Sequence, residues 1–473
     1  MTPPIATIIV VIGIVGLCLL DWERETKTST ALWIPIVWLA IIGSRPVAQW
    51  LAPEPPEDSA AQLLDGSPID RMVYSVLLFF ALVVLCTRGR KAFAVLRQNA
   101  PILLFFSYCL LSVIWSDFPD VALKRWIKDL GDFLMVLIIL TDPAPLVALK
   151  RLLTRVGLLL VTLSILFIKY FPDLGRSYSP WTGETSYTGV TTNKQGLGML
   201  ILIFGLGALW QLVYLYRAKD VPVRRRHLLV QGVLLGEVIW LLTMAHSLTS
   251  TACFLMMGCL VAAIGLFKSC QKPAFIHLFV TSATSLTILS LFFSPGSSLI
   301  ESMGRNSTLT GRTEIWGLVL NMPINRLVGT GFESFWLGPR LQEIWSLYWW
   351  HPNEAHNGYI EVLLNLGWIG VALLALMLLN GYRRITSDLR RDPETNNIRL
   401  AYLLVGVIYA FTEAAFRMLT FTWIFLLYAT AADADVPVPE AQPVPRRAGL
   451  PFKPKREPEL DHSLVVGRRR GSI

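Results

Sequence analysis

Long apolar runs recur along the whole of this 473-residue chain and constrain its fold more than any other feature. A helix needs roughly 17–25 predominantly apolar residues to cross a bilayer. About 13 segments approach or reach that length, which predicts an all-α, polytopic membrane protein with about 12–13 transmembrane helices. Of these segments, 31–50 and 128–141 are the weakest candidates. The full set is 4–20, 31–50, 72–86, 101–116, 128–141, 153–170, 196–216, 228–246, 250–267, 275–293, 358–380, 398–413 and 417–432.

Composition and charge indicate the same class of protein. The chain is 53% hydrophobic and 16% charged, whereas a soluble protein carries about 25% charged residues. Its mean hydropathy is +0.53. The net charge of +9 could indicate a nucleic-acid partner. However, Lys and Arg form short clusters between the apolar runs, as they do in cytoplasmic loops. We therefore expect membrane lipids around the protein and no nucleic acid.

Basic clusters mark every second loop, whereas the intervening segment 51–70 is acidic. Because cytoplasmic loops carry an excess of Lys and Arg, this alternation predicts an outer N-terminus and an inner C-terminus. It also places the longest loop, 294–357, on the non-cytoplasmic side. The basic residues are Arg88, Arg90, Lys91, Arg97, Lys150, Arg151, Arg155, Arg217, Lys219, Arg224, Arg225, Arg226, Lys268, Lys272, Arg383, Arg384, Arg390 and Arg391.

The chain is expected to divide into a transmembrane domain, 1–432, and a tail, 433–473. The tail is rich in Pro and ends in three arginines at 468–470. Such a composition cannot bury a core, so the tail is predicted to be disordered and cytoplasmic. The first apolar run, 4–20, has no basic residue before it and is predicted to be a membrane helix, not a cleaved signal.

The loop 294–357 is predicted to contain two short amphipathic helices, at 313–322 and 341–348. Their aromatic residues would suit the membrane–water interface. The loop also carries four arginines on the side where the positive-inside rule expects few cations. Anionic lipid headgroups or a phosphate-bearing substrate would each account for them, since guanidinium groups match phosphate oxygens. The four are Arg305, Arg312, Arg326 and Arg340.

Three residues of the same loop, His351, Glu354 and His356, could bind a metal. Their spacing differs from the His-Glu-x-x-His of a helical zinc site, and Pro352 disfavours a regular helix there. We therefore expect no metal. The chain also has no Gly-rich nucleotide fingerprint, and no cofactor is expected.

Four short motifs follow one another between about residues 180 and 375. They are Thr-Thr-Asn-Lys at 191–194, Gly-Arg-x-x-x-Trp at 311–316, Gly-x-Gly-Phe at 329–332, and His-Asn-Gly-Tyr-Ile-Glu at 356–361 before a helix with Gly367 and Gly370. Their content and order resemble the signature of the O-antigen ligase and O-antigen polymerase superfamily. Gly-Ser-Arg-Pro at 43–46 and the segment 66–71 resemble its branch of exopolysaccharide-production polymerases.

The resemblance implies a membrane glycan polymerase or ligase of exopolysaccharide or O-antigen biosynthesis. It would transfer an oligosaccharide from a polyprenyl-diphosphate donor to a sugar hydroxyl of a glycan or lipid-glycan acceptor, on the periplasmic face of a bacterial cytoplasmic membrane. The hydroxyl needs a base, which His356 could be, with Asn357 positioning it or the sugar. Arg312 could stabilise the leaving diphosphate. Further substrate-binding candidates are Asn193, Lys194, Arg305 and Glu361.

One stretch departs from the family pattern. Residues 246–251 lack the Arg that family ligases often carry there, so a second phosphate-binding cation would have to come from Lys194, Arg176 or Arg305. Without the motif, His356 could simply be an interfacial histidine bonded to its loop. The alternative functions are a transporter or flippase of lipid-linked sugars and a non-catalytic subunit of an export complex. The scarcity of charges at mid-depth in the apolar runs favours an enzyme; polymerase and ligase both fit the residues.

Overall fold

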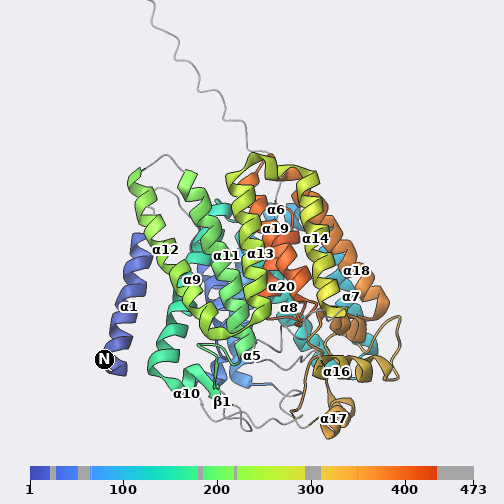
Figure 1. Ribbon diagram of the computed structural model, residues 1–473. Helices are drawn as coiled ribbons and strands as arrows, with labels where there is room; N and C mark the ends of the chain where they lie inside the picture. Colours follow the sequence, from blue (N-terminus) through green and yellow to red (C-terminus); the bar gives the residue numbers. More distant parts are fainter. Residues whose placement is uncertain are drawn as a thin grey trace, which may run out of the picture. The chain divides into compact units, whose positions relative to one another are not determined.

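The protein is described by a computed structural model over residues 1–21, 28–51, 64, 66–178, 185–217, 221–292, 310–348 and 350–433. Nearly all regular structure in these ranges is helical (Figure 1). The exception is a two-stranded antiparallel sheet, in which β1 (Arg176–Tyr178) pairs with β2 (Thr185–Tyr187). The prediction of an all-α, polytopic membrane protein is confirmed. The predicted tail lies outside the described residues except for Asp433.

Seven helices within the described ranges are long and apolar enough to cross a membrane. One bent pair would make eight if it were a single span. It joins α6 (Gly89–Gln98) to the segment Ala100–Trp115, which comprises α7 (Ala100–Leu111) and a 3-10 turn, and its bend is 87°. The seven are α1 (Pro3–Leu20), α5 (Pro68–Thr87), α9 (Pro145–Tyr170), α11 (Lys194–Arg217), α12 (Val221–Ala245), α13 (Leu248–Leu266) and α18 (Gly358–Asp388).

The other predicted spans also contain helices, but these are shorter or more charged. α8 (Pro119–Leu140) carries several ionised residues in its first half. α20 (Phe421–Thr430) has only 10 residues, all of them buried by neighbouring helices. A helix enclosed in this way need not match the thickness of the bilayer, so the apolar run at 417–432 does not correspond to a full-length span. The remaining helices are α2 (Trp33–Ile42), α3 (Val47–Leu51), α14 (Pro273–Phe292) and α19 (Pro393–Tyr409).

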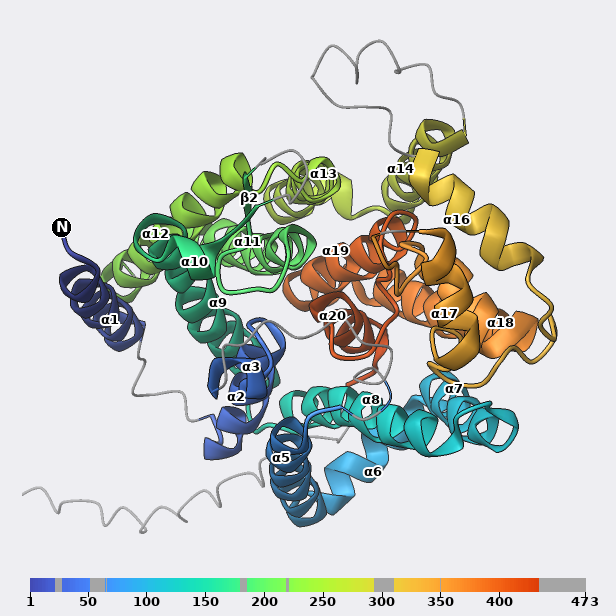
Figure 2. The ribbon, with the colours of Figure 1, turned by 90° about the horizontal axis from the view of Figure 1, so that it is seen from below.

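Buried carboxylates hold the central helices together. Figure 2 shows α19 and α20 in the middle of the bundle, with α8 beside them. Asp129 of α8 accepts a hydrogen bond of 2.6 Å from the indole of Trp423 in α20. One turn away, Asp132 accepts one of 2.8 Å from Trp38 in α2 and another from the main chain of Leu419. Three of these carboxyl oxygens thereby gain a donor, which offsets the cost of removing them from water.

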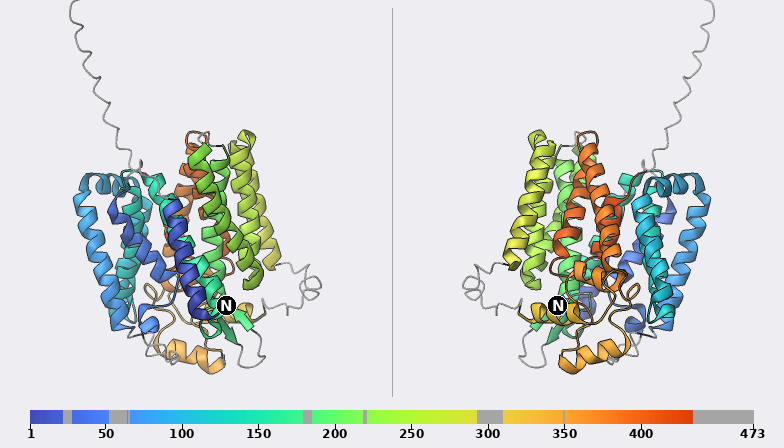
Figure 3. Two further views of the ribbon diagram at one scale, coloured as in Figure 1. Left: turned by 90° about the vertical axis from the view of Figure 1, so that its left-hand side faces the viewer. Right: turned by 90° about the vertical axis from the view of Figure 1, so that its right-hand side faces the viewer.

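The two ends of the bundle differ in the loops they carry. α10 (Pro172–Gly175), β1, α16 (Thr310–Asn321) and α17 (Gly338–Leu347) lie at the end where the N-terminus lies (Figures 1 and 3). The basic turn η3 (Lys268–Gln271) lies at the opposite end. Loops predicted to be cytoplasmic and loops predicted to be outside are therefore separated in space. Below, the end with α16 and α17 is called the loop end.

The predicted amphipathic helices 313–322 and 341–348 correspond to α16 and α17. Their apolar side chains form a small core of their own, with Ile315, Phe335 and Leu341 fully buried. The indole of Trp316 donates to the carbonyl of Ala355 at 2.7 Å. Trp316 was expected to lie at the membrane–water interface, and the structure shows that its side chain helps to hold the loop together.

A break in α18 fixes the position of this loop. Gly367 has a φ of 65°, which interrupts the helix. The segment 326–331 runs along the break and forms main-chain hydrogen bonds of 2.9–3.2 Å with residues 364–369. A Cβ on Gly329 would collide with the main chain of Asn365, and one on Gly367 with that of Leu327. The glycines of two sequence motifs are thus required by one close approach of backbones.

Candidate functional site

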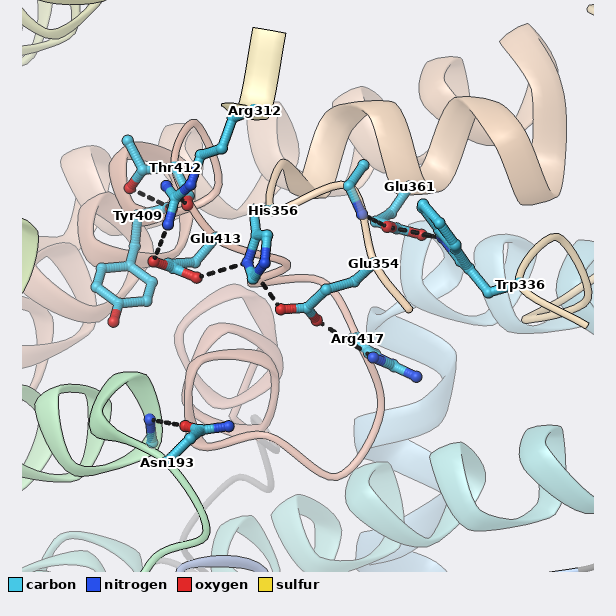
Figure 4. A network of polar contacts seen from close by, with 12 residues as sticks. Asn193, Arg312, Trp336, Glu354, His356, Glu361, Tyr409, Thr412, Glu413 and Arg417 are labelled. Atoms are coloured by element: carbon cyan, nitrogen blue, oxygen red, sulfur yellow. Dashed lines mark hydrogen bonds and ion pairs between the residues drawn. The ribbon is translucent and has the colours of Figure 1, made fainter. Parts of the chain in front are cut away.

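His356 lies between two carboxylates at the loop end of the bundle (Figure 4). Its Nδ1 is 2.9 Å from Oε1 of Glu354 and 3.3 Å from Oε2 of Glu413. Glu354 belongs to the same loop, whereas Glu413 comes from the connection between α19 and α20. His356 has a φ of 49°, a value that L-residues rarely adopt, so the surrounding contacts must hold it there.

The two residues after His356 anchor it to the α19–α20 connection. Asn357 caps α18, since its Oδ1 accepts hydrogen bonds from the main chains of Tyr359 and Ile360 at 3.0 and 3.1 Å. Its amide also donates to a carbonyl of that connection. The Gly358 N–H reaches the carbonyl of Glu413 at 3.1 Å. The Asn357 side chain, a predicted substrate contact, is therefore engaged in holding the site.

Arg312 joins the same cluster from α16. Its Nη2 lies 3.0 Å from Oε1 of Glu413, and its Nη1 donates to the carbonyl of Thr412. Glu413 therefore contacts His356 with one oxygen and Arg312 with the other. The structure brings together the two residues predicted to be catalytic, and it does so through a carboxylate that the motifs do not contain.

Arg417 extends the cluster on the other side of His356. Its Nη1 is 3.2 Å from Oε2 of Glu354, and its Nε is 3.5 Å from Oε2 of Glu333. Glu333, with a φ of 50°, also accepts a hydrogen bond from Arg125 of α8 on its carbonyl. The result is a line of alternating charge, called here the His356 network. Its members are Arg312, Glu413, His356, Glu354, Arg417 and Glu333.

The network sets the charge of its members. Burial disfavours the imidazolium, but the hydrogen bonds and negative charges of Glu354 and Glu413 raise the pKa of His356 to about 9. Burial also opposes ionisation of Glu354, yet its contacts with His356 and Arg417 lower the pKa of Glu354 to about 2. Against the effect of burial, Glu333 and Glu354 raise the pKa of Arg417. At neutral pH the imidazole, this carboxyl and this guanidinium are all ionised.

Glu361, a predicted substrate contact, lies in the first turn of α18. Its carboxylate accepts bonds of 3.0 and 2.9 Å from the indole of Trp336 and another from the main chain of Ala355. One turn later, Asn365 accepts from the main chains of Ser334 and Phe335. Glu361 thus holds the residue just before His356, and together with Asn365 it fastens the loop to α18.

The remaining predicted residues are separate from this network. Asn193 is exposed at the start of α11, where its Oδ1 accepts from the main chain of Gly196 at 2.7 Å. Lys194 is the first residue of α11 and is also exposed. Figure 4 draws Asn193 without a contact to His356. Arg305 lies outside the described residues.

Motif reasoning missed Glu413 and Arg417. They are the only charged residues between the apolar helices α19 and α20, in the segment 410–420. Two opposite charges in one short connection, outside the predicted cytoplasmic loops, could have indicated that this connection belongs to the site. Arg417 also supplies a second guanidinium near His356, where the sequence offered only Lys194, Arg176 or Arg305.

Glu354, His356 and Glu413 have ligand atoms within 4.8 Å of one another, a spacing that a metal ion could bridge. However, each carboxylate also forms an ion pair, Glu354 with Arg417 and Glu413 with Arg312. The imidazole would have to be neutral to bind a metal, whereas its pKa is raised to about 9. The ion pairs with Arg417 and Arg312 favour an internal network at this position; the expectation of no metal stays a prediction.

Residues 233–375 match the family model described as O-antigen ligase. The resemblance to the O-antigen ligase superfamily is confirmed. The matched region contains Arg312 and His356 but ends before Glu413. The chain is also similar to the exopolysaccharide production protein ExoQ of Rhizobium meliloti (strain 1021). The two are 24% identical over 351 residues, 70% of this chain and 76% of the relative. These findings support a membrane enzyme of polysaccharide biosynthesis.

Proposed function

We propose that this protein is a glycosyltransferase of exopolysaccharide or O-antigen biosynthesis. It transfers an oligosaccharide from a polyprenyl-diphosphate carrier to a sugar hydroxyl of a glycan or lipid-glycan acceptor. The observation that carries the proposal is the arrangement of His356 between Glu354 and Glu413, with Arg312 on the same Glu413. In its neutral form, His356 is a proton acceptor close to a cation suited to a diphosphate, as this chemistry requires.

The proton moves to His356 in the proposed step. The carboxylates hold Nδ1, and Nε2 has no hydrogen-bond partner among the described residues. The acceptor oxygen forms a bond to the anomeric carbon of the donor while the bond from that carbon to the diphosphate breaks. The electron pair of the broken bond leaves with the diphosphate, and the hydroxyl proton goes to Nε2. The two carboxylates then stabilise the imidazolium, as the aspartate does in a Ser-His-Asp triad.

Arg312 is proposed to receive the leaving diphosphate. Its guanidinium is fixed by Thr412 and Glu413 but keeps partial exposure, and guanidinium N–H groups pair well with phosphate oxygens. Fixed donors of this kind stabilise developing charge without reorganising during the reaction. Arg417, on the other side of His356, is the candidate for the second cation.

The loop end is proposed to face the periplasm across a bacterial cytoplasmic membrane. The position of a basic turn supports this orientation. The basic turn η3 lies at the opposite end of the bundle, as the positive-inside rule expects for a cytoplasmic turn. At this end of the spans the His356 network lies where a lipid-borne donor would present its diphosphate.

The test is glycan transfer by the purified full-length protein in lipid nanodiscs, with a lipid-linked oligosaccharide as the donor. His356→Gln should lower the rate about 100-fold or more, the usual contribution of a general base. His351→Gln is the matched control, because His351 lies in the same loop, also has a positive φ, and stacks on Trp345 outside the network. Normal transfer by His356→Gln would remove this residue from the mechanism. A transporter would form no glycosidic bond at all.

A further inference from the structure

A second group of cations lies at the loop end, between α5 and α8. It lines a pocket of about 240 Å³, and none of the described lining residues is acidic. The cations come from the first two turns of α5 and the first three turns of α8, so they face each other across the pocket. They are Arg71, Lys124, Arg125 and Lys128.

The same pocket has apolar walls. Tyr74 and Leu78 of α5 line it, and the ammonium group of Lys128 lies 5.8 Å from the centre of the Tyr74 ring. Outside the pocket, α5 exposes Met72 and Phe79, 63% exposed in each case. Large apolar side chains on a candidate span face lipid. The pocket therefore combines cations with apolar walls, on a helix that exposes other large apolar side chains, which suits an anion carried by a lipid and not a free anion.

The pocket is joined to the His356 network through Arg125. This residue lines the pocket and donates to the carbonyl of Glu333, whose carboxylate faces Arg417. Arg417 in turn contacts Glu354, the neighbour of His356. A chain of contacts through Arg125, Glu333, Arg417 and Glu354 thus links the pocket to the proposed catalytic base.

We propose that the α5–α8 pocket binds the diphosphate of a second lipid-linked substrate, the acceptor. The proposal rests on the proposed function, in which the donor diphosphate lies at Arg312. A lipid-linked acceptor reacts through a hydroxyl at the sugar end of its glycan, while its diphosphate stays at the lipid end. Its diphosphate must therefore lie away from His356, and the pocket provides cations at such a displaced position. Two sites for lipid diphosphates indicate a polymerase, because both substrates of a polymerase are lipid-linked.

The first test measures binding. Native mass spectrometry of the full-length protein would count bound farnesyl diphosphate, a short prenyl diphosphate. We expect two molecules for each wild-type chain. The double substitution Lys124→Gln and Lys128→Gln should leave one, with affinity at the pocket about tenfold weaker or more, because two charge-assisted contacts are lost. The matched control is Lys268→Gln with Lys272→Gln, two exposed lysines at the opposite end, which should still bind two.

Competition with phosphatidylglycerol distinguishes a site for a prenyl diphosphate from a site for ordinary phospholipid headgroups. A preference of the pocket for farnesyl diphosphate supports the proposal. Equal displacement by phosphatidylglycerol would reduce the pocket to an ordinary headgroup site and overturn it, as would two bound molecules in the Lys124→Gln, Lys128→Gln protein. Thermal unfolding of each variant shows whether the fold is intact.

The Arg312→Gln protein separates this inference from the proposed function. It should no longer bind farnesyl diphosphate at the position of Arg312, while the α5–α8 pocket should still bind one molecule. If Arg312→Gln still binds two and the double lysine variant binds one, the pocket stands and the assignment of Arg312 to the donor fails. In turnover, loss of the two lysines should raise KM for the lipid-linked acceptor about tenfold with little change in KM for the donor. The reverse pattern would assign the pocket to the donor and contradict the proposal.

Discussion

Nδ1 of His356 lies 2.9 Å from Oε1 of Glu354, only two positions earlier in the chain. The left-handed backbone of His356, with a φ of 49°, accompanies this contact between close sequence neighbours. The pair acquires its properties from distant segments, because Glu413 adds a second carboxylate on the imidazole and Arg417 binds the far oxygen of Glu354. A contact within the loop and a contact from a distant segment therefore determine the ionisation of His356 together.

The rate of transfer should rise with pH. A base must be unprotonated, and with a pKa of about 9 only about one His356 in a hundred is neutral at pH 7. The kcat/KM should therefore increase about tenfold per pH unit below pH 9 and level off above it. Glu354→Gln removes one of the carboxylates that raise this pKa, so the rising limb should move to lower pH. A profile that is flat from pH 6 to 9 would contradict the role of His356 as base.

Glu413 should be as important as the motif residues. Glu413→Gln breaks the carboxylate contacts with His356 and Arg312 together, and we expect transfer to fall about tenfold to a hundredfold. Glu343→Gln makes the same chemical change at an exposed position of α17 and should have little effect. Equal rates for the two variants would show that Glu413 does not position the site.

Arg417 should contribute to stability as well as activity. Arg417→Gln leaves Glu354 and Glu333 without their guanidinium partner. We expect the free energy of unfolding to fall by about 1–3 kcal/mol, the usual cost of leaving buried polar groups unpaired. The unfolding temperature in detergent would report it, with the exposed Arg326→Gln as control. Arg417→Lys should recover part of the stability; an unchanged unfolding temperature for Arg417→Gln would contradict the ion-pair assignment.

Chelation should not affect transfer. The carboxylates of Glu354 and Glu413 already pair with Arg417 and Arg312, and a divalent cation would have to displace those contacts. We expect a rate within about twofold of the untreated protein after EDTA treatment and dialysis, since no step requires a metal. A loss that magnesium or zinc reverses would assign the Glu354–His356–Glu413 cluster to a metal.

The elements of this fold followed from hydrophobic periodicity, but the number of full spans did not. The apolar run at 417–432 contains the ten-residue α20, which other helices enclose, and sequence alone cannot distinguish lipid from protein as the surrounding medium. Within the site, Arg312 and His356 were found because each lies in a recognisable motif. Glu413 follows His356 by 57 positions and meets it only through packing of α18 against α19 and α20, which no local pattern encodes.

The break at Gly367 has a consequence for how the site can vary. Four bonds between segment 326–331 and α18 join main-chain atoms, and one more comes from the hydroxyl of Thr330, so their alignment depends little on the loop's other side chains. Residues that face the glycan can be exchanged while His356 stays in place. The same helix therefore carries both the anchor of the loop, around Gly367, and a candidate membrane span, which continues to Asp388.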